Sequence, residues 1–441
     1  MKKSFKRIFI ILTLLSMLVL LASCKEDDST DAAATGNTVV LNVYNWGEYI
    51  SDGFQGSMDT NAEFEKYFNE TLSSKYGGIK VKVNYTTYDT NENMYSKLSS
   101  GAGSYDIVIP SDYMIQKMIA NDMLLAFDAT TLSNYGNISD EFKGENAYYD
   151  PENLYSVPYT YGMLGVIYNT ALVDEVDYKD KSWGLLWNDK YKGKILQFNN
   201  PRDAFGSAMY YGDLDINSKD TAVWDKALDS LVKQKPLLQG YVNDEIFNKM
   251  TTASASIAPY FAGDFLIMAS QNEDLSFYYP KEGTNYFVDA MCILKDSKNP
   301  EIAKEYINFM LTEAPAVANA IYIGYASPNK LVVKNPQYQE EMSLLHEDWY
   351  DILYGLSPSE ANKNYSYPPS YESFTPEIQS YVNTLWESLK TENSTELWVH
   401  ISCGIIVAGV LALAIYTIYT KKKRSRDYRM RDKMLAKSKN K

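Results

Sequence analysis

The chain has 441 residues, of which 45% are hydrophobic, and its formal net charge is −14. This length allows two or three domains with sizeable cores. The basic residues gather at the ends: Lys2, Lys3, Lys6 and Arg7 contribute +4 and residues 421–441 contribute +9, so the region between them carries −27. An acidic body argues against nucleic acid as a partner and favours a cationic ligand through long-range steering, although solubility alone would also explain it.

Cysteine and histidine are too sparse and scattered for metal or nucleophilic chemistry. The three cysteines, Cys24, Cys292 and Cys403, fall in separate regions, so no disulfide framework is implied. The two histidines, His346 and His400, lack partners at zinc-ligand spacing and form no nucleophilic pair with a cysteine. An enzyme acting on amines would need a cofactor site, and the chain has no glycine-rich dinucleotide loop. We therefore expect no metal, no cofactor and no enzymatic activity.

Residues 1–24 have the pattern of an export signal. A basic start is followed by an almost wholly apolar run over residues 8–21. The segment ends in the letters LASC, which resemble the lipobox of bacterial lipoproteins and predict a lipid on Cys24. A plain N-terminal membrane helix is the alternative. Residues 25–37 are small and polar, as is typical of a flexible tether.

A second membrane attachment is expected near the C-terminus. Residues 397–420 carry no charge apart from a possible one on His400, and the stretch is long enough to span a bilayer as a transmembrane helix. The basic segment 421–441 follows at once, which places this tail in the cytoplasm and the acidic body outside. A buried soluble helix is the alternative. A single acyl chain anchors only marginally, so the helix would make the attachment permanent.

Between these ends, strand-like and helical patterns alternate. The expected strands cover residues 39–43, 79–85, 106–110, 156–159, 164–168 and 194–198. The expected helices are one that begins at Glu92 with Asn91 as its cap, and others over 112–120, 220–234 and 299–311. The alternation predicts an α/β fold with mostly parallel sheets. The roughly 350 residues between the ends exceed one ordinary domain, so we expect two lobes.

The first candidate site lies where the first strand runs into Tyr44-Asn45-Trp46-Gly47-Glu48-Tyr49. Ligands of open α/β sheets bind beside the carboxyl ends of strands. An aromatic face attracts a cation and a carboxylate pairs with it, so Trp46, Glu48 and Tyr49 suggest a pocket for an organic cation. Taken alone, the two aromatics are more simply explained as half-buried core residues beside a turn.

Further segments also place a carboxylate near an aromatic ring or a hydroxyl. They are Ser111-Asp112-Tyr113, the segment from Asn200 to Phe205 with Asp203, the segment from Tyr260 to Asp264, and the segment from Tyr286 to Asp289. Phe287 and Asp289 are two apart in a strand, so they can line one wall. Alone, Asp112 could cap a helix, Asp203 could pair with the neighbouring arginine, and Asp264 could belong to a turn. An alkyl diamine or triamine, however, needs carboxylates for its amines and aromatic walls for its methylenes. It would also relieve the cost of bringing several acids together.

In order and spacing, these segments match a known family. The matching segments lie at 44–49, 91–98, 105–113, 155–159, 186–187, 191–194, 200–205, 280–283, 287–289 and 323–329. They include YDIVIPSDY at 105–113, NPRDAF at 200–205 and IGYASPN at 323–329. On these motifs the chain resembles the periplasmic spermidine/putrescine-binding proteins of polyamine ABC transporters, over about residues 39–335.

The resemblance implies a two-lobe periplasmic-binding-protein fold of type II that closes on a polyamine. Lobe one would comprise residues 38–157 with 290–333, and lobe two 158–289 with 334–392. The ligand-binding residues that it implies are Trp46, Tyr49, Ser111, Tyr113, Asp203, Phe261, Asp264, Phe287, Asp289 and Tyr325, and the carboxylate pattern adds Glu48 and Asp112. The implied partners are ABC permease subunits with their ATPase, at the outer face of the cell membrane.

The chain also departs from the family pattern. Phe261 and Phe287 stand where spermidine-type members often have tryptophan, whose larger ring attracts a cation more strongly. Asn200 stands where those members have an acid, and residues 51–78 are longer than the equivalent segment. The family's glutamine near the C-terminal end has no clear counterpart within 365–377. Putrescine and spermidine therefore both stay open as ligands.

We thus expect an extracytoplasmic solute-binding protein that captures putrescine or spermidine in an acidic, aromatic-lined cleft and delivers it to an ABC permease. The alternative is a membrane-tethered polyamine sensor that signals through its transmembrane helix. The basic tail holds no catalytic domain, so a sensor would need a signalling partner.

Overall fold

The computed structural model describes residues 37–391. The expected export signal with Cys24, nearly all of the tether, the expected transmembrane helix at 397–420 and the basic tail lie outside the described residues. Within 37–391, no helix combines the length and the apolar character that crossing a membrane requires.

The described chain forms two compact units. Unit 1 comprises the described residues up to Pro110, Asn121–Val157 and Met291–Ile323. Unit 2 comprises Ser111–Ala120, Pro158–Ala290 and the described residues from Gly324 onward. These units differ from the expected lobes at residues 111–120, 290 and 324–333, which the sequence assigned to lobe one and which lie in unit 2.

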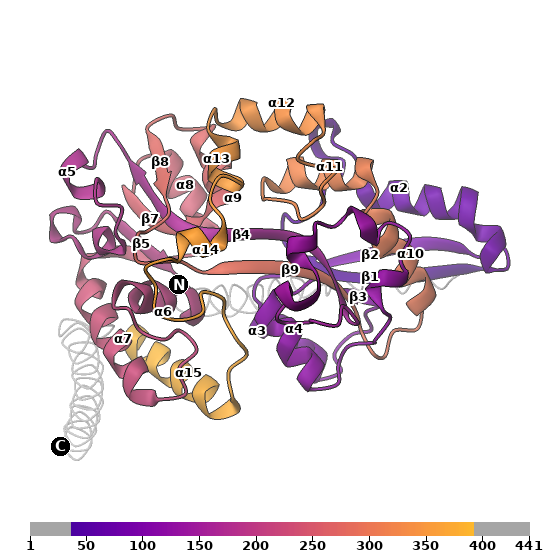
Figure 1. Ribbon diagram of the computed structural model, residues 1–441, viewed down its shortest axis with the longest axis horizontal. Coiled ribbons are helices and arrows are strands. Elements are labelled where there is room, and N and C mark those ends of the chain that lie inside the picture. The colour runs from indigo at the N-terminus through magenta and orange to yellow at the C-terminus, as the bar shows by residue number, and fades with distance from the viewer. Residues whose placement is uncertain (1–36, 392–441) are drawn as a thin grey trace, which may run out of the picture. The chain divides into compact units, whose positions relative to one another are not determined.

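Unit 1 is built on a mixed sheet (Figure 1). Its strands are β1 (Thr38–Trp46), β2 (Lys80–Tyr88), β3 (Ile107–Val108) and the end of β9 (Tyr286–Ile293). β1 is parallel to both β2 and β3, whereas β3 pairs antiparallel with β9. Leu41 and Val43 are fully buried and Asn42 between them is partly exposed, because alternate side chains of a strand point to opposite faces.

The helices of unit 1 cover its sheet. They are α2 (Thr60–Tyr67), which continues into a π-helical turn (Phe68–Leu72), α3 (Asn91–Ser99), α10 (Pro300–Met310) and α11 (Glu313–Ile323). The expected cap of α3 was wrong by one residue. Thr90 has extended backbone angles and its hydroxyl accepts the N–H of Asn93, so Thr90 is the cap and Asn91 is the first helical residue.

Unit 2 also contains a mixed sheet. Its strands are β4 (Ser156–Asn169), β5 (Ile195–Phe198), β6 (Leu238–Val242), β7 (Ile257–Phe261) and β8 (Leu275–Tyr278). β5 is parallel to β6 and β7, whereas β4 is antiparallel to β7 and β8. The expectation of mostly parallel sheets was therefore incomplete. The antiparallel pairs come from β4, β8 and β9.

The two strands expected at 156–159 and 164–168 are one continuous strand, β4. The residues between them stay extended because Tyr161 forms a bridge with Ala326 and Gly162 lies against the ring of Phe287. A Cβ at Gly162 would come within 2.9 Å of the Phe287 Cζ atom. The sequence predicted two separate strands with a break between them. Gly162 instead allows close packing within one continuous strand and marks no turn.

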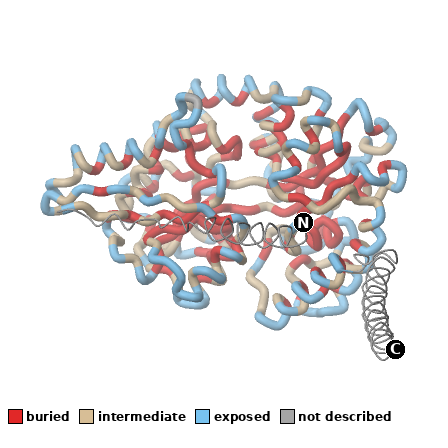
Figure 2. Tube along the Cα trace, turned by 180° about the vertical axis from the view of Figure 1, so that it is seen from behind, coloured by how far each residue is buried: buried red, intermediate tan, exposed pale blue. Residues whose placement is uncertain are grey.

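Unit 2 contains helices of very different lengths. They are α4 (Asp112–Ala120), α5 (Glu175–Tyr178), α6 (Pro201–Tyr211), α7 (Thr221–Gln234), α8 (Glu245–Thr251), α9 (Ala262–Ala269), α12 (Pro336–Leu345), α13 (Trp349–Leu353), α14 (Pro358–Ala361) and α15 (Pro376–Thr391). In α7, Asp220 caps the first turn and Trp224, Ala227 and Leu231 form the buried stripe. Figure 2 shows burial along the chain: buried stretches run through the interior, and the outer helices alternate between buried and exposed residues.

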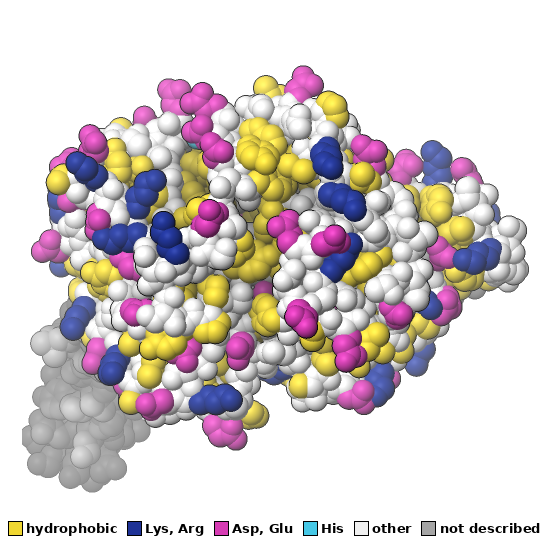
Figure 3. All heavy atoms as spheres, viewed as in Figure 1, with side chains coloured by type: hydrophobic (Ala, Val, Ile, Leu, Met, Phe, Trp, Pro, Cys, Tyr) yellow, Lys and Arg dark blue, Asp and Glu magenta, His cyan; other side chains and the backbone are white. Residues whose placement is uncertain are grey.

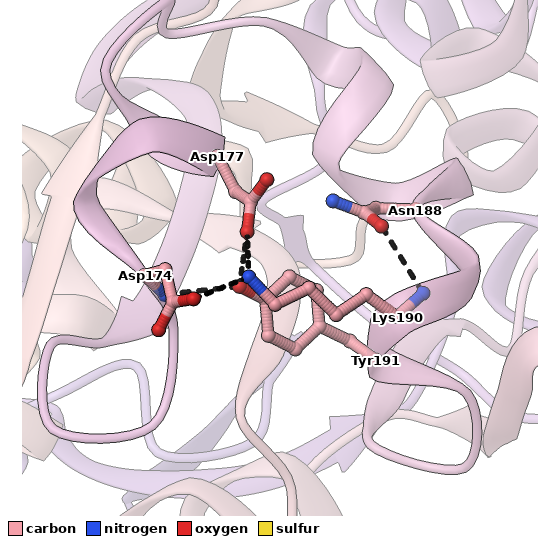
Figure 4. Close-up of polar contacts among 5 residues, drawn as sticks. All are labelled: Asp174, Asp177, Asn188, Lys190 and Tyr191. Atoms are coloured by element: carbon pink, nitrogen blue, oxygen red, sulfur yellow. Dashed lines mark hydrogen bonds and ion pairs between the residues drawn. The ribbon is translucent and has the colours of Figure 1, made fainter.

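Ion pairs at the surface fix short connecting segments. Lys190 reaches Asp177 at 2.6 Å and Asp174 at 2.5 Å, and the Tyr191 hydroxyl donates to Asp177 at 2.5 Å (Figure 4). These contacts join α5 to the turn at Asp189–Tyr191. On the face seen in Figure 3, acidic and basic side chains are interspersed rather than gathered into one basic patch. This surface does not suggest nucleic-acid binding.

Candidate functional site

The expected site residues divide between the two units. Trp46, Glu48 and Tyr49 belong to unit 1. The remaining ones, Ser111, Asp112, Tyr113, Asp203, Phe261, Asp264, Phe287, Asp289 and Tyr325, belong to unit 2. Each group is described within its own unit.

In unit 1, Trp46 stands at the end of a column of aromatic rings. Its ring centroid lies 4.7 Å from that of Tyr88. The Tyr88 centroid lies 5.0 Å from that of Tyr44, and the Tyr44 ring stacks on Tyr105 with centroids 4.4 Å apart. The Tyr88 hydroxyl donates to the Ile109 carbonyl at 2.7 Å, so the ring beneath Trp46 is held in place. Trp46 itself is partly exposed. The column therefore presents one indole at the carboxyl end of β1.

The rest of the hexapeptide forms a turn stabilised by Asn45. Its side-chain oxygen accepts the N–H of Trp46 at 2.8 Å and its amide donates to the Tyr49 carbonyl at 3.3 Å. Glu48 is exposed, has a left-handed backbone (φ 52°), and accepts a hydrogen bond from Tyr322 at 3.0 Å. Burial, with Glu48 nearby, raises the pKa of Tyr322 to about 12. Tyr49 is buried, so within unit 1 Trp46 is the more accessible of the two expected aromatic residues.

Three aromatic side chains of unit 2 pack against one another. The ring centroid of Phe261 lies 5.4 Å from Phe287 and 6.2 Å from Tyr325, and Phe287 and Tyr325 are 6.1 Å apart. The rings come from the end of β7, from β9 and from the segment that precedes α12. Phe261 is partly exposed. The structure thus brings together three expected residues that are far apart in sequence, and we name them the aromatic triad.

Asp264 joins this triad through a short hydrogen bond. The Tyr325 hydroxyl donates to its carboxylate at 2.5 Å. Burial raises the pKa of Asp264 to about 7; the Tyr325 bond opposes this shift and the negative charge of Asp244 adds to it. Gly263 makes the contact possible, since a Cβ there would lie 2.0 Å from the Tyr325 Cδ1 atom. The result is a carboxyl that is poorly compensated by positive charge.

The start of α4 lies beside β9. Ser111 forms an isolated antiparallel bridge with Asp289, and both are buried. The two Asp112 oxygens accept the N–H groups of Tyr113 at 2.7 Å and of Val288 at 3.0 Å. Asp112 is 1% exposed, and these bonds favour a structural role for it. Its carboxylate ties α4 to the strand that carries Phe287 and Asp289.

Asp203 lies in the first turn of α6, where Asn200 is the cap. The Asn200 side chain accepts the Asp203 N–H at 2.8 Å and donates to its carboxylate at 2.9 Å. The preceding strand β5 ends in Phe198, whose ring is 5.7 Å from Phe261 of the triad. Burial, and then the charges of Asp264, Asp244, Asp203 and Glu245, raise the pKa of Tyr260 well above its usual range. These four acids therefore contribute negative charge to the same region of unit 2, around Tyr260.

Sequence reasoning missed three residues of these groups. Tyr88 supports Trp46, Asp244 adds negative charge beside Asp264, and Tyr371 lies beside Asp203. None of them belongs to a motif, and Tyr371 is in the stretch 365–377 where no counterpart of a family residue was found. Only the fold brings these side chains to the site. Within 37–391, no group of three or more His, Cys, Asp or Glu side chains could hold a metal ion.

The fold and these side chains define a class of protein. Chain segments pass repeatedly between two α/β units, and rings and carboxylates collect at strand ends. Residues 62–344 match the family described as bacterial extracellular solute-binding protein, and the chain belongs to this family. It is a family of binding proteins, which agrees with the expectation that this chain is not an enzyme.

Particular relatives narrow the comparison. The spermidine/putrescine-binding periplasmic protein of Salmonella typhimurium is 31% identical over 316 residues, which cover 71% of this chain and 85% of the relative. A solved putative spermidine/putrescine ABC transporter protein from Listeria monocytogenes is 32% identical with a TM-score of 0.64, over 81% of this chain and 100% of that one. The spermidine/putrescine ABC transporter substrate-binding protein PotD from Streptococcus pneumoniae is 32% identical with a TM-score of 0.60, over 80% and 98%. The expected resemblance and the periplasmic-binding-protein fold are confirmed.

Proposed function

We propose that this chain captures a linear polyamine, putrescine or spermidine, outside the cytoplasm and delivers it to the permease of an ABC transporter. The observation that carries the proposal is the aromatic triad of unit 2 together with Asp264 and Asp203. Relatives of similar sequence are spermidine/putrescine-binding proteins, which supports the same ligand class.

The physical argument concerns both parts of the ligand. Aromatic faces pack against methylenes and attract ammonium groups, most strongly where water is excluded. A carboxyl with a pKa near 7, such as that of Asp264, ionises at a cost in the empty protein. An ammonium group beside it would lower that pKa and offset the cost of desolvation. A neutral ligand of the same length could not do this.

The same proposal extends to the ends of the chain. A lipid on Cys24 and a transmembrane helix at 397–420 would hold the binding units at the outer face of the cell membrane. The lipobox-like letters before Cys24 and the basic residues after 420 support these two attachments.

Calorimetric titration of the full chain in detergent tests the proposed ligand class. Putrescine and spermidine should bind. 1,4-Butanediol, which is neutral, and succinate, which is a dianion, have four carbons like putrescine but no ammonium groups, and they should not bind. Asp264→Asn should weaken binding, and Lys190→Met, which changes a surface ion pair of the same unit, should not. An absence of heat with every polyamine, in a sample that unfolds cooperatively, would contradict the proposal.

The basic tail favours a second candidate, a polyamine sensor. Deleting 421–441 separates the two functions, because transport needs the binding units and signalling needs the tail. Uptake of labelled putrescine by cells should be unchanged by the deletion if the chain serves transport. Loss of a polyamine-dependent transcriptional response, with uptake intact, would favour the sensor instead.

A further inference from the structure

One helix of unit 1, α11, holds the turn that follows β1 at two points. The side-chain oxygen of its buried residue Asn319 accepts the N–H of Ser51 at 2.9 Å. The same oxygen accepts the hydroxyl of Thr60, the first residue of α2, at 2.9 Å. Near the end of the helix, the Tyr322 hydroxyl donates to the Glu48 carboxylate at 3.0 Å. Residues three apart on a helix lie on the same face, so both contacts come from one side of α11.

The two contacts act on different parts of the turn. Ser51 and Thr60 are buried, so the contact with Asn319 belongs to the core of unit 1 and fixes the end of the turn. The Tyr322 contact is solvent-exposed and reaches Glu48 inside the turn, where the backbone is left-handed with φ 52°. This conformation is costly for a residue other than glycine, and a hydrogen bond from a hydroxyl to a carboxylate contributes a free energy of similar size. The Tyr322 bond can therefore decide whether the turn keeps its shape.

Two expected ligand residues lie beside Glu48 in the turn: Tyr49 follows it, and Trp46 precedes it by two residues. Asn45 ties both of them to the turn, because its side chain accepts the Trp46 N–H at 2.8 Å and donates to the Tyr49 carbonyl at 3.3 Å. A change of φ at Glu48 would move Tyr49 relative to Trp46 and would strain both hydrogen bonds of Asn45. The contact from α11 therefore controls how the two aromatic residues are placed.

We infer that Tyr322 is a positioning residue of the polyamine site: through its hydrogen bond to Glu48 it holds the turn after β1 in the shape that places the two aromatic residues for the ligand. The inference rests on the proposed function and adds to it a residue that stands just before the matched segment 323–329. A turn that already has this shape loses less conformational entropy when the ligand arrives, so the bond contributes to affinity without touching the ligand.

Calorimetry with putrescine on the full chain in detergent tests this role in three backgrounds. Tyr322→Phe should weaken binding about three- to tenfold, the effect of one lost hydrogen bond. In a Glu48→Ala background the same change should have no further effect, because the acceptor is gone. In a Glu48→Gln background it should weaken binding again, because the glutamine side-chain oxygen still accepts the bond. Equal weakening in all three backgrounds would show a tyrosine that acts independently of residue 48 and would overturn the inference.

Amide hydrogen exchange of the ligand-free chain gives a second readout, which does not depend on binding. The N–H groups of Trp46 and Ser51 are bonded to side chains, so their exchange reports opening of the turn. Tyr322→Phe and Glu48→Ala should each speed exchange over residues 46–51, and the double variant should exchange no faster than the faster single variant. Unchanged exchange over 46–51 in Tyr322→Phe would contradict the positioning role.

Tyr76→Phe is the matched control. The Tyr76 hydroxyl also donates to a glutamate of unit 1, Glu305 at 2.7 Å, and this pair joins the segment before β2 to α10. The control should leave both the dissociation constant for putrescine and the exchange over 46–51 unchanged. A wild-type chain that binds no polyamine would defeat the proposed function as a whole. Binding by wild type with an unchanged affinity of Tyr322→Phe would defeat only this inference.

Discussion

Replacing Asp264 with asparagine removes a carboxyl whose pKa is raised from 3.8 to about 7. Burial raises this pKa, the hydrogen bond from the Tyr325 hydroxyl lowers it, and the negative charge of Asp244 raises it further. In the unfolded chain the group ionises near its ordinary value, so between these two pKa values the native state binds more protons than the unfolded state. The contribution of Asp264 to the free energy of unfolding therefore falls as the pH rises from about 4 to about 7.

The size of the effect follows from the shift. Each pKa unit corresponds to about 1.4 kcal/mol, so ionising Asp264 in the native protein costs about 4 kcal/mol once the pH is well above 7. At about pH 5 this carboxyl is already ionised in the unfolded chain, so part of the loss in the free energy of unfolding is already present there. The rest of the loss, about 2.5 kcal/mol, develops between about pH 5 and about pH 8.

Denaturant unfolding of wild type and Asp264→Asn at these two pH values measures the effect. The difference in the free energy of unfolding between the two proteins should change by about 2.5 kcal/mol, in favour of the asparagine variant at the higher pH. Asp150, another buried acid with a raised pKa, is present in both proteins and cancels. A difference that stays constant with pH would refute the placement of a poorly compensated carboxyl at this site.

Further predictions concern close packing and ion pairs in unit 2. Gly263→Ala should displace the Tyr325 ring, whose Cδ1 atom would lie 2.0 Å from the new methyl, and should lower both polyamine affinity by calorimetry and the thermal midpoint by scanning calorimetry. Gly162→Ala should act in the same way through Phe287, more mildly because the nearest atom would be 2.9 Å away; an effect larger than that of Gly263→Ala would contradict this ranking. Lys190→Met breaks exposed ion pairs only, so the thermal midpoint should stay nearly unchanged, and a large drop would mean that these pairs are not solvent-screened.

The strand and helix patterns of the sequence predicted much of each unit. The expected strands at 39–43, 79–85 and 194–198 and the expected helices at 112–120, 220–234 and 299–311 correspond to β1, β2, β5, α4, α7 and α10. Periodic burial and local capping residues produce these patterns, and both depend on residues that are close together in the sequence. The predictions from sequence were wrong where a contact between residues far apart in sequence determined the structure. Gly162 continues β4 because of Phe287, and residues 111–120 belong to unit 2 because of contacts such as that of Asp112 with Val288.

By itself, the sequence determined the chemical character of the candidate site: acids and aromatic rings that follow strands, and a family resemblance that the comparisons confirm. It also predicted Phe261, Asp264, Phe287 and Tyr325 as site residues, which the structure brings together in one group. Only the tertiary structure decided what each side chain contacts. Glu48 accepts a hydrogen bond from Tyr322 and Asp112 accepts one from the backbone of β9, because hydrogen bonds between segments far apart in sequence depend on packing that no local pattern records.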